Sequence, residues 1–199
     1  MNERDFPFNA ELLEFFNGLM QYNTGQMFVN IFVDIPAFFM PVFLFVWWLF
    51  YTFKQKNIAK KIELLNIFYT AVIGIFANII LQQFFHFERP EELCKTTGNL
   101  ILQHLPDASF PSDHAAMSFA FMVAVYLAGY KKTAFALSFV FTCMIISRVM
   151  ACVHWPYDVL VGAIFGSLIS LFTFKFLQKN SFVQAFNEKI IWIAGKMKL

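Results

Sequence analysis

Five apolar stretches, separated by short polar segments, make up most of the chain. They cover residues 35–53, 64–87, 115–130, 133–147 and 159–174. A membrane-spanning helix needs about 20 mostly apolar residues, and the first two stretches are long enough for one each. The last three become long enough only if neighbouring polar residues lie in the outer half of the membrane. The pattern therefore predicts an all-α bundle of about five transmembrane helices with a buried polar site.

The two ends of the chain have a different pattern. Residues 8–22 place apolar side chains at helical spacing with Glu11 and Glu14 on the opposite side. This arrangement predicts an N-terminal interfacial helix on the membrane surface rather than a span. Residues 181–197 are expected to lie in the same way on the other surface. Disordered ends are the alternative for both segments.

Two further features concern individual spans. The first stretch begins with Asp34 and Pro36, which are expected at the N-cap and in the first turn of its helix. The last stretch contains Gly162 and Gly166, a pair of small residues at a spacing that is typical of close helix packing. No catalytic role is expected for these glycines.

The composition narrows the class of protein. Hydrophobic residues make up 59% of the 199 residues and charged residues 14%, whereas soluble domains carry about a quarter charged residues. Such a chain has too little polar surface to fold in water, which favours a polytopic membrane protein. No internal repeat or linker divides it, so residues 1–199 are interpreted as a single domain. The net charge of +2 gives no indication of a nucleic-acid partner.

Lysine placement predicts the orientation in the membrane. Lysines gather in the loop after the first stretch, in the tight turn Lys131-Lys132 and in the C-terminal tail. With five spans these three groups lie on one side, which the positive-inside rule assigns to the cytoplasm. The N-terminus, the loop 88–113 and the turn 148–158 then lie on the extracytoplasmic side of the cell membrane.

Three polar segments share that extracytoplasmic side. They are FERPEE (87–92), FPSDH (110–114) and SRVMACVHWPYD (147–158). Arginine forks match phosphate oxygens, and Pro111 and Pro156 are both expected in the first turn of a helix, whose free N–H groups favour an anion. No carboxylate cluster suited to Mg²⁺ is evident. The segments therefore predict a phosphate site that uses no metal and no other cofactor.

Two histidines and one carboxylate give this site possible chemistry. His154 and Asp158 are four residues apart, which on a helix places them on one face. A carboxylate there can keep one imidazole nitrogen protonated and leave the other as a nucleophile. His114, from another segment, could donate a proton to a departing oxygen. The alternative is that these residues are bystanders: interfacial histidines, a snorkelling Arg89 and a helix-capping Asp158.

The same residues resemble the three-part signature of the type-2 phosphatidic acid phosphatases, the PAP2 superfamily. The three blocks lie at residues 82–90, 111–114 and 147–158: Arg89-Pro90, then Pro111-Ser112-Asp113-His114, then Ser147-Arg148 with His154 and Asp158 at fixed spacing. The likeness is greatest to small bacterial members that dephosphorylate undecaprenyl pyrophosphate. It implies a membrane lipid phosphatase with a lipid phosphate or pyrophosphate as its partner. Phosphatidylglycerophosphate, phosphatidate and lipid A phosphate remain alternative substrates, and a non-catalytic lipid- or anion-binding membrane protein remains a second alternative.

The resemblance also implies a role for each matching residue. His154 would attack the phosphorus and form a phosphohistidine, and Asp158 would orient it. His114 would protonate the leaving oxygen and then activate the water that resolves the intermediate. The phosphoryl oxygens would be bound by the backbone N–H groups around Asp113 and by the side chains of Gln82, Arg89, Ser112 and Arg148.

Two positions depart from the family pattern. Gln82 stands where the first block usually has lysine, so that one positive charge is missing. Asp113 stands where the second block usually has glycine, and it places a carboxylate beside a phosphate site. The lipid pyrophosphatase-like members often share this aspartate, which favours that branch.

Several other polar residues have no assigned role. The spacing of Cys94 and Cys152 gives little reason to expect a disulfide. Asn66 and Asn78 could face either the bundle or the site. The remaining ones are interpreted as solvated loop residues or as structural histidines: Glu88, Glu91, Glu92, His86 and His104.

Overall fold

The described part of the protein is built from helices. The computed structural model describes residues 6–85, 87–94 and 109–198, and every regular element that these residues form is helical. The all-α expectation is therefore confirmed. His86 and His104 lie outside the described residues.

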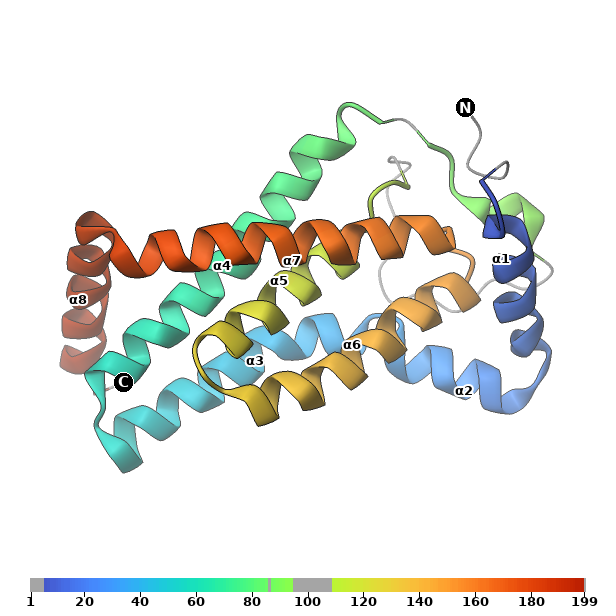
Figure 1. Cartoon of the computed structure of the whole chain (residues 1–199). Helices are drawn as coiled ribbons and strands as arrows, with labels where there is room; N and C mark the ends of the chain where they lie inside the picture. Colours follow the sequence, from blue (N-terminus) through green and yellow to red (C-terminus); the bar gives the residue numbers. More distant parts are fainter. Residues whose placement is uncertain (1–5, 86, 95–108, 199) are drawn as a thin grey trace.

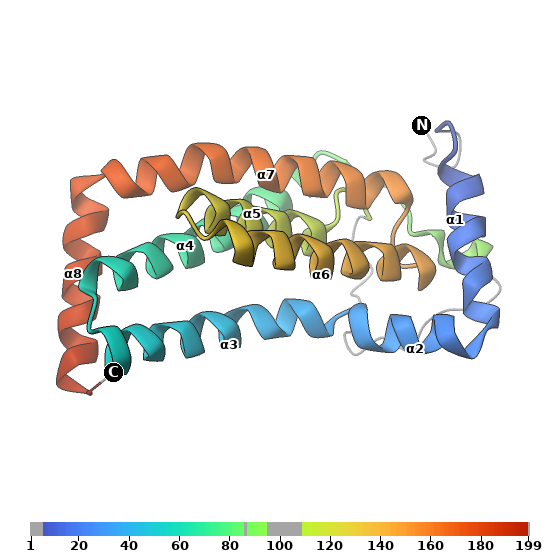
Figure 2. The ribbon, with the colours of Figure 1, turned by 60° about the horizontal axis from the view of Figure 1, so that its bottom comes forward.

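A bundle of roughly parallel and antiparallel helices forms the body of the molecule (Figures 1 and 2). Its members are α3 (Ile35–Phe50), α4 (Ile58–Gln82), α5 (Asp113–Leu127), α6 (Lys131–Met150) and α7 (Pro156–Lys179). By length and composition, four helical segments of the described chain could cross a membrane, and α5, with 15 residues, is shorter than these. A membrane bundle is thus confirmed, and the number of spans stays a prediction.

The helices extend beyond their apolar stretches into polar sequence. The helix α6 continues past residue 147 to include Arg148, and α7 starts ahead of residue 159 and includes Asp158. The helix α5 begins at Asp113 and includes His114. These three polar residues are therefore part of the helices at one end of the bundle, as the short apolar stretches predicted.

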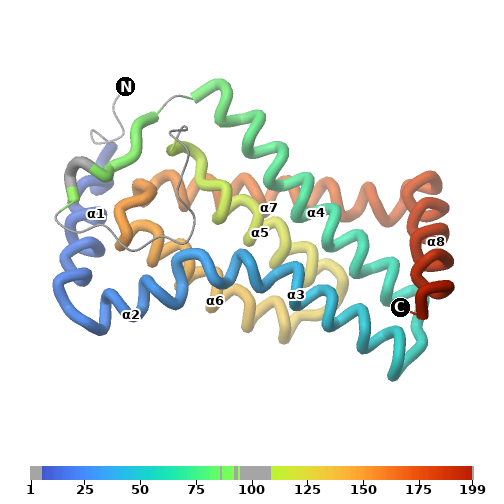
Figure 3. Tube along the Cα trace, turned by 180° about the vertical axis from the view of Figure 1, so that it is seen from behind, coloured from blue at the N-terminus to red at the C-terminus, as the bar shows by residue number. Residues whose placement is uncertain are grey.

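Short helices lie across both ends of the bundle (Figures 1 and 3). At one end, α1 (Asn9–Gly18) and a 3₁₀ turn (Leu19–Gln21) precede α2 (Asn23–Phe32), a helix that the sequence pattern did not predict. At the other end lies α8 (Ser181–Lys196). Both ends are thus ordered helices, although α1 does more than cover a surface. Its buried Leu13 packs with Trp155 and other residues of the α6–α7 region.

The closest helix contact in the core joins α5 to α7. A Cβ atom on Gly162 would lie 2.6 Å from the carbonyl oxygen of Ser112, and one on Gly166 would overlap the backbone of Ala116. The facing side of α5 carries fully buried alanines. The prediction of close packing by the two glycines is confirmed, and this contact places the start of α5 against the first turns of α7.

The lysine-rich segments lie together at one end of the bundle. Figure 1 shows the α3–α4 connection, the α5–α6 turn and α8 at this end. The segment 87–94, α1 and the α6–α7 turn lie at the opposite end. The lysines and the residues of the polar segments are thus separated by the length of the bundle.

Candidate active site

The starts of α5 and α7 are held next to each other. The backbone N–H of Ser112, the N-cap residue of α5, donates to the carbonyl of Asp158, 3.1 Å away. Pro156 is the first residue of α7, as expected. The expectation for Pro111 is wrong, because this residue precedes the N-cap of α5. Pro111 lies outside α5, and its carbonyl accepts hydrogen bonds from side chains of α4.

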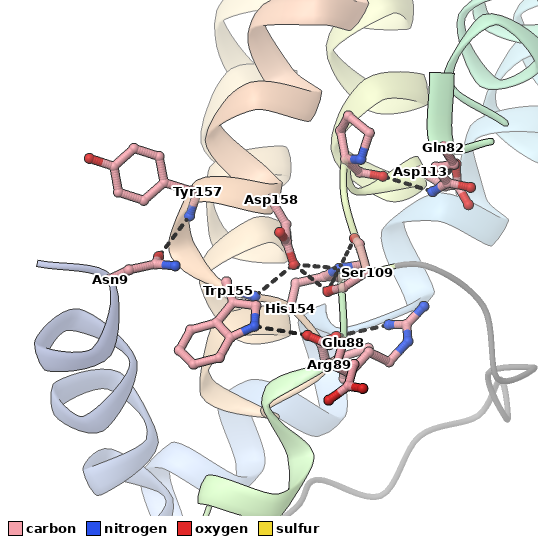
Figure 4. A network of polar contacts seen from close by, with 12 residues as sticks. Asn9, Gln82, Glu88, Arg89, Ser109, Asp113, His154, Trp155, Tyr157 and Asp158 are labelled. Carbon is pink, nitrogen blue, oxygen red and sulfur yellow. Dashed lines mark hydrogen bonds and ion pairs between the residues drawn. The ribbon is translucent and has the colours of Figure 1, made fainter. Parts of the chain in front are cut away.

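His154 and Asp158 are in contact, although not for the reason that their spacing suggested. His154 lies before α7 and is therefore not on a helix face with Asp158. Asp158 is the third residue of α7, and its Oδ2 accepts the backbone N–H of Trp155 at 2.8 Å. His154 Nδ1 lies 3.3 Å from the same oxygen. Asp158 therefore caps the helix and faces the imidazole at once (Figure 4).

Ser109 completes the surroundings of His154. Its carbonyl oxygen lies 3.0 Å from His154 Nδ1, and its hydroxyl donates to Asp158 Oδ2. A carbonyl oxygen only accepts, so the hydrogen bond requires a proton on Nδ1. The lone pair of the neutral ring is then on Nε2, the nitrogen available for nucleophilic attack. Sequence reasoning missed Ser109, whose one signal was its place two residues before Pro111.

The Arg89 segment is fixed to the turn that carries His154. Arg89 Nη1 donates to the carbonyl of Val153 at 2.8 Å, and Trp155 Nε1 donates to the carbonyl of Glu88 at 3.0 Å. These contacts place the guanidinium beside the His154 turn (Figure 4) and make it more than a snorkelling flank.

A disulfide adds a covalent tie between the same two segments. Cys94 and Cys152 are bonded, with Cα atoms 6.3 Å apart. The expectation that they would not pair is wrong. They are 58 residues apart in the sequence, and only the folding of segment 87–94 onto the α6–α7 turn brings them together.

Ser112 is buried beside these groups without a hydrogen bond from its side chain. The residue is fully buried, and its Oγ has no partner among the described residues. It occupies the N-cap of α5, yet the hydroxyl does not cap the helix. Buried polar groups are nearly always paired, so this hydroxyl is suited to a ligand oxygen at the helix start.

Arg148 is fully buried and ion-paired. Its Nη1 lies 2.7 Å from Asp34 Oδ1 and donates to the carbonyl of Val33 at 3.3 Å. His114 Nε2 lies 3.6 Å from the same carboxylate oxygen. Asp34 is indeed the N-cap residue of α3, but its side chain does not cap the helix. Sequence reasoning missed its contact with the site, and the only signal was a carboxylate at the start of an apolar span.

Gln82 and Asp113, the two residues that depart from the family pattern, are hydrogen-bonded to each other. The Gln82 amide donates to Asp113 Oδ1 at 3.2 Å and to the Pro111 carbonyl at 2.8 Å. Asn78 makes the same pair of bonds, at 2.7 and 2.9 Å. The Asp113 carboxylate is thus held by two neutral amides of α4. Asn78 faces the site, whereas Asn66 bonds Asn187 of α8 at the other end of the bundle.

This pairing predicts how Gln82 and Asp113 respond to substitution. Gln82→Lys should bring a cation that pairs with Asp113, so the inhibition constant for inorganic phosphate should change by less than about threefold. In the Asp113→Gly background the same lysine is free to bind phosphate, and we expect about tenfold tighter inhibition. Comparing the wild type, the two single variants and the double variant measures the coupling between positions 82 and 113. Equal effects of the lysine in both backgrounds would contradict it.

Comparisons with known proteins agree on one family. A family model described as the PAP2 superfamily matches residues 62–182. The chain is 28% identical over 178 residues to the bacitracin transport permease protein BcrC of Bacillus licheniformis, covering 88% of this chain and 83% of the relative. It is 25% identical over 173 residues to the undecaprenyl-diphosphatase BcrC of Bacillus subtilis (strain 168), covering 84% and 83%. The crystal structure of Aquifex aeolicus LpxE is similar in fold, with a TM-score of 0.68, 23% identity and coverage of 88% of this chain and 99% of that one.

Proposed function

The chain belongs to the PAP2 superfamily and is a membrane lipid phosphatase, and we propose that it hydrolyses undecaprenyl pyrophosphate to undecaprenyl phosphate and inorganic phosphate. The observation that carries this proposal is the hydrogen bonding of His154, which leaves Nε2 as the nucleophilic nitrogen on a turn to which Arg89 is bound. The name of the Bacillus subtilis relative and the aspartate at position 113 support the choice of substrate.

The first step of the proposed reaction transfers the terminal phosphoryl group to the enzyme. His154 Nε2 attacks the phosphorus, a P–N bond forms, and the bond from phosphorus to the bridging oxygen breaks. His114 donates a proton to that oxygen as undecaprenyl phosphate leaves. Arg89, Arg148 and the Ser112 hydroxyl bind the phosphoryl oxygens, whose negative charge the two guanidinium groups neutralise.

The second step returns the enzyme to its starting state. A water molecule attacks the phosphorus, and His114, now neutral, accepts the proton that this water loses. The P–N bond breaks, and its electron pair returns to Nε2. Asp158 and the Ser109 carbonyl hold the proton on Nδ1 throughout. This step releases inorganic phosphate and regenerates free His154, so that the whole cycle yields one undecaprenyl phosphate and one inorganic phosphate.

The active site is proposed to face the extracytoplasmic side of the cell membrane. The lysines gather at the opposite end of the bundle, which the positive-inside rule assigns to the cytoplasm. The disulfide between Cys94 and Cys152 lies at the active-site end, and disulfides persist in oxidising compartments outside the cytoplasm. In this orientation the polyprenyl chain stays in the bilayer while its headgroup enters between the helix starts.

A panel of lipid substrates tests the proposal. Purified protein in detergent with EDTA should release phosphate from undecaprenyl pyrophosphate with kcat/KM at least about tenfold above that for phosphatidate, phosphatidylglycerophosphate and a lipid A phosphate. The reason is that a departing phosphate is a weaker base than a departing alkoxide and needs less help from a proton donor.

Each contrary result has a definite meaning. A higher kcat/KM for a phosphomonoester would replace the proposed substrate. Binding of these lipids with no turnover of any of them would favour the non-catalytic alternative. Loss of activity in EDTA would contradict charge neutralisation by Arg89 and Arg148 alone.

A further inference from the structure

Asp34 is a buried carboxylate at the junction of α2 and α3, far in sequence from the three signature blocks. It is fully buried, and its Oδ1 faces both Arg148 Nη1 at 2.7 Å and His114 Nε2 at 3.6 Å. A carboxylate buried at this depth is costly unless it is paired. The ion pair with Arg148 already compensates the buried charge of Asp34. The His114 imidazole is a second neighbour of the carboxylate, which charge compensation alone does not require.

We propose that Asp34 is a positioning residue that Arg148 anchors and that holds His114 in the orientation of a proton donor. This inference rests on the proposed function. The short charge-assisted bond to Arg148 fixes the carboxylate. The fixed negative charge then attracts the protonated imidazole and orients its ring, since the attraction between opposite charges is strong where water is excluded.

The geometry also assigns the two ring nitrogens of His114. Nε2 faces Asp34, so Nδ1 is the atom that transfers the proton to the leaving oxygen. The site thus contains two pairs of histidine and carboxylate that are used differently. Asp158 and the Ser109 carbonyl keep Nδ1 of His154 protonated so that Nε2 attacks. Asp34 faces Nε2 of His114 at ion-pair distance, so that Nδ1 donates.

A double-mutant cycle between Asp34→Asn and His114→Asn tests this role. The measurement is the single-turnover rate of terminal phosphate release from undecaprenyl pyrophosphate. Asp34→Asn alone should slow release about 10- to 100-fold, a part of what a proton donor contributes. In the His114→Asn background the same change should cost less than about threefold. Equal losses in both backgrounds would overturn the proposal.

Binding of vanadate, a phosphate mimic, distinguishes positioning of His114 from a purely structural effect on Arg148. The vanadate inhibition constant should rise less than about threefold in Asp34→Asn. A rise that matches the loss in rate would mean that Asp34 acts through Arg148 alone, and the proposal would be wrong. If Asp34→Asn does not fold, Asp34→Glu keeps the charge opposite Arg148, displaces the carboxylate by one methylene and enters the same cycle.

Two controls complete this experiment. Glu63→Gln removes a carboxylate at the lysine-rich end, where Glu63 pairs with Lys60, and should leave the rate unchanged. Wild-type turnover in the same assay tests the proposed function separately. Absence of wild-type turnover counts against the proposed substrate, whereas equal losses in the cycle count against the role of Asp34.

A second inference concerns the opposite end of the bundle and is independent of the catalytic site. A cavity of about 1070 Å³ lies between the π-helical turn Tyr51–Gln55, the start of α4 and α8. Its lining includes Lys56, Lys61, Lys196 and Lys198, with Glu188 as an acidic lining residue. The cavity therefore carries an excess of positive charge.

Aromatic and apolar groups accompany these lysines. Lys61 Nζ lies 4.7 Å from the Trp48 ring centroid, and Lys196 Nζ lies 3.6 Å from that of Trp192. Isoleucine and phenylalanine side chains supply apolar lining. Lysine and tryptophan together are typical of the membrane–water interface.

We infer that this cavity binds the headgroup of an anionic phospholipid from the leaflet on the lysine-rich side. The lysines would contact the phosphate, and the apolar lining would contact the upper part of an acyl chain. Basic pockets between helices at this interface are suited to anionic headgroups. A zwitterionic lipid lacks the net negative charge that the lysines complement.

Native mass spectrometry with phosphatidylglycerol tests this site, with phosphatidylcholine as the neutral lipid. Lys56→Gln with Lys198→Gln should weaken phosphatidylglycerol binding about tenfold. The matched control is Lys131→Gln with Lys132→Gln, which removes two charges at the start of α6, outside the cavity. It should change binding less than about threefold. Equal loss in both pairs, or equal binding of both lipids, would overturn the inference.

Discussion

Replacing His154 with glutamine should abolish turnover, with kcat at least about 10³-fold lower than in the wild type. Glutamine keeps a polar side chain in the site, but it has no nitrogen lone pair that can form a bond to phosphorus. The loss should appear as a missing phosphoenzyme: acid-labile label from the terminal phosphate should be trapped on wild-type protein after rapid quenching and be absent from the variant.

His114→Asn provides the contrast for this experiment. This variant keeps the nucleophile and loses the proton donor, so it should still acquire label, although more slowly. Thermal melting of both variants verifies that they are folded. If His154→Gln retains more than a tenth of the wild-type rate, the assignment of the nucleophile is wrong.

Gly166→Ala should have the largest effect on stability. A Cβ at this position overlaps the backbone of Ala116, including its carbonyl oxygen and Cα. No rotamer change relieves a clash with backbone, so α5 and α7 must separate along their closest contact. We expect a loss of about 3 kcal/mol or more in the free energy of unfolding, measured by thermal or denaturant unfolding in detergent.

Gly18→Ala is the matched control for this substitution. Gly18 also lies in a helix, but a Cβ there meets nothing within 4 Å. Alanine is the better helix former, so Gly18→Ala should be neutral or stabilise by up to about 1 kcal/mol. Similar destabilisation by both substitutions would mean that the α5–α7 contact is not the cause.

The five helices of the bundle were predictable because each contains a long apolar run. A span is a long run of apolar residues, and this information is local in the sequence. The helix α2 was less accessible, because its residues 23–32 mix Asn23, Gln26 and Asn30 with apolar side chains and form no apolar run long enough for a span. Pro36 indicated where α3 starts, but nothing indicated that another helix precedes it.

The side chains of the candidate site were predictable where a motif has fixed spacing, and not where partners come from distant segments. The pair of Arg148 and Asp34 joins residues 114 positions apart, and Asn78 meets Asp113 across 35 positions. Such contacts depend on how the helices pack. The contact of His154 with Asp158 was expected for a wrong reason, because the helix that was expected to carry both residues begins after His154.

The short length of α5 suggests different exit routes for the two proposed products, inorganic phosphate and the polyprenyl phosphate. Its 15 residues correspond to about 22 Å, and the helix ends next to Lys131-Lys132, whose charges belong at the membrane surface. The hydrocarbon core is about 30 Å thick, so in the proposed orientation the start of α5 would lie below the opposite surface. Inorganic phosphate would then escape along the bundle axis to water, whereas the polyprenyl phosphate would diffuse away sideways within the bilayer.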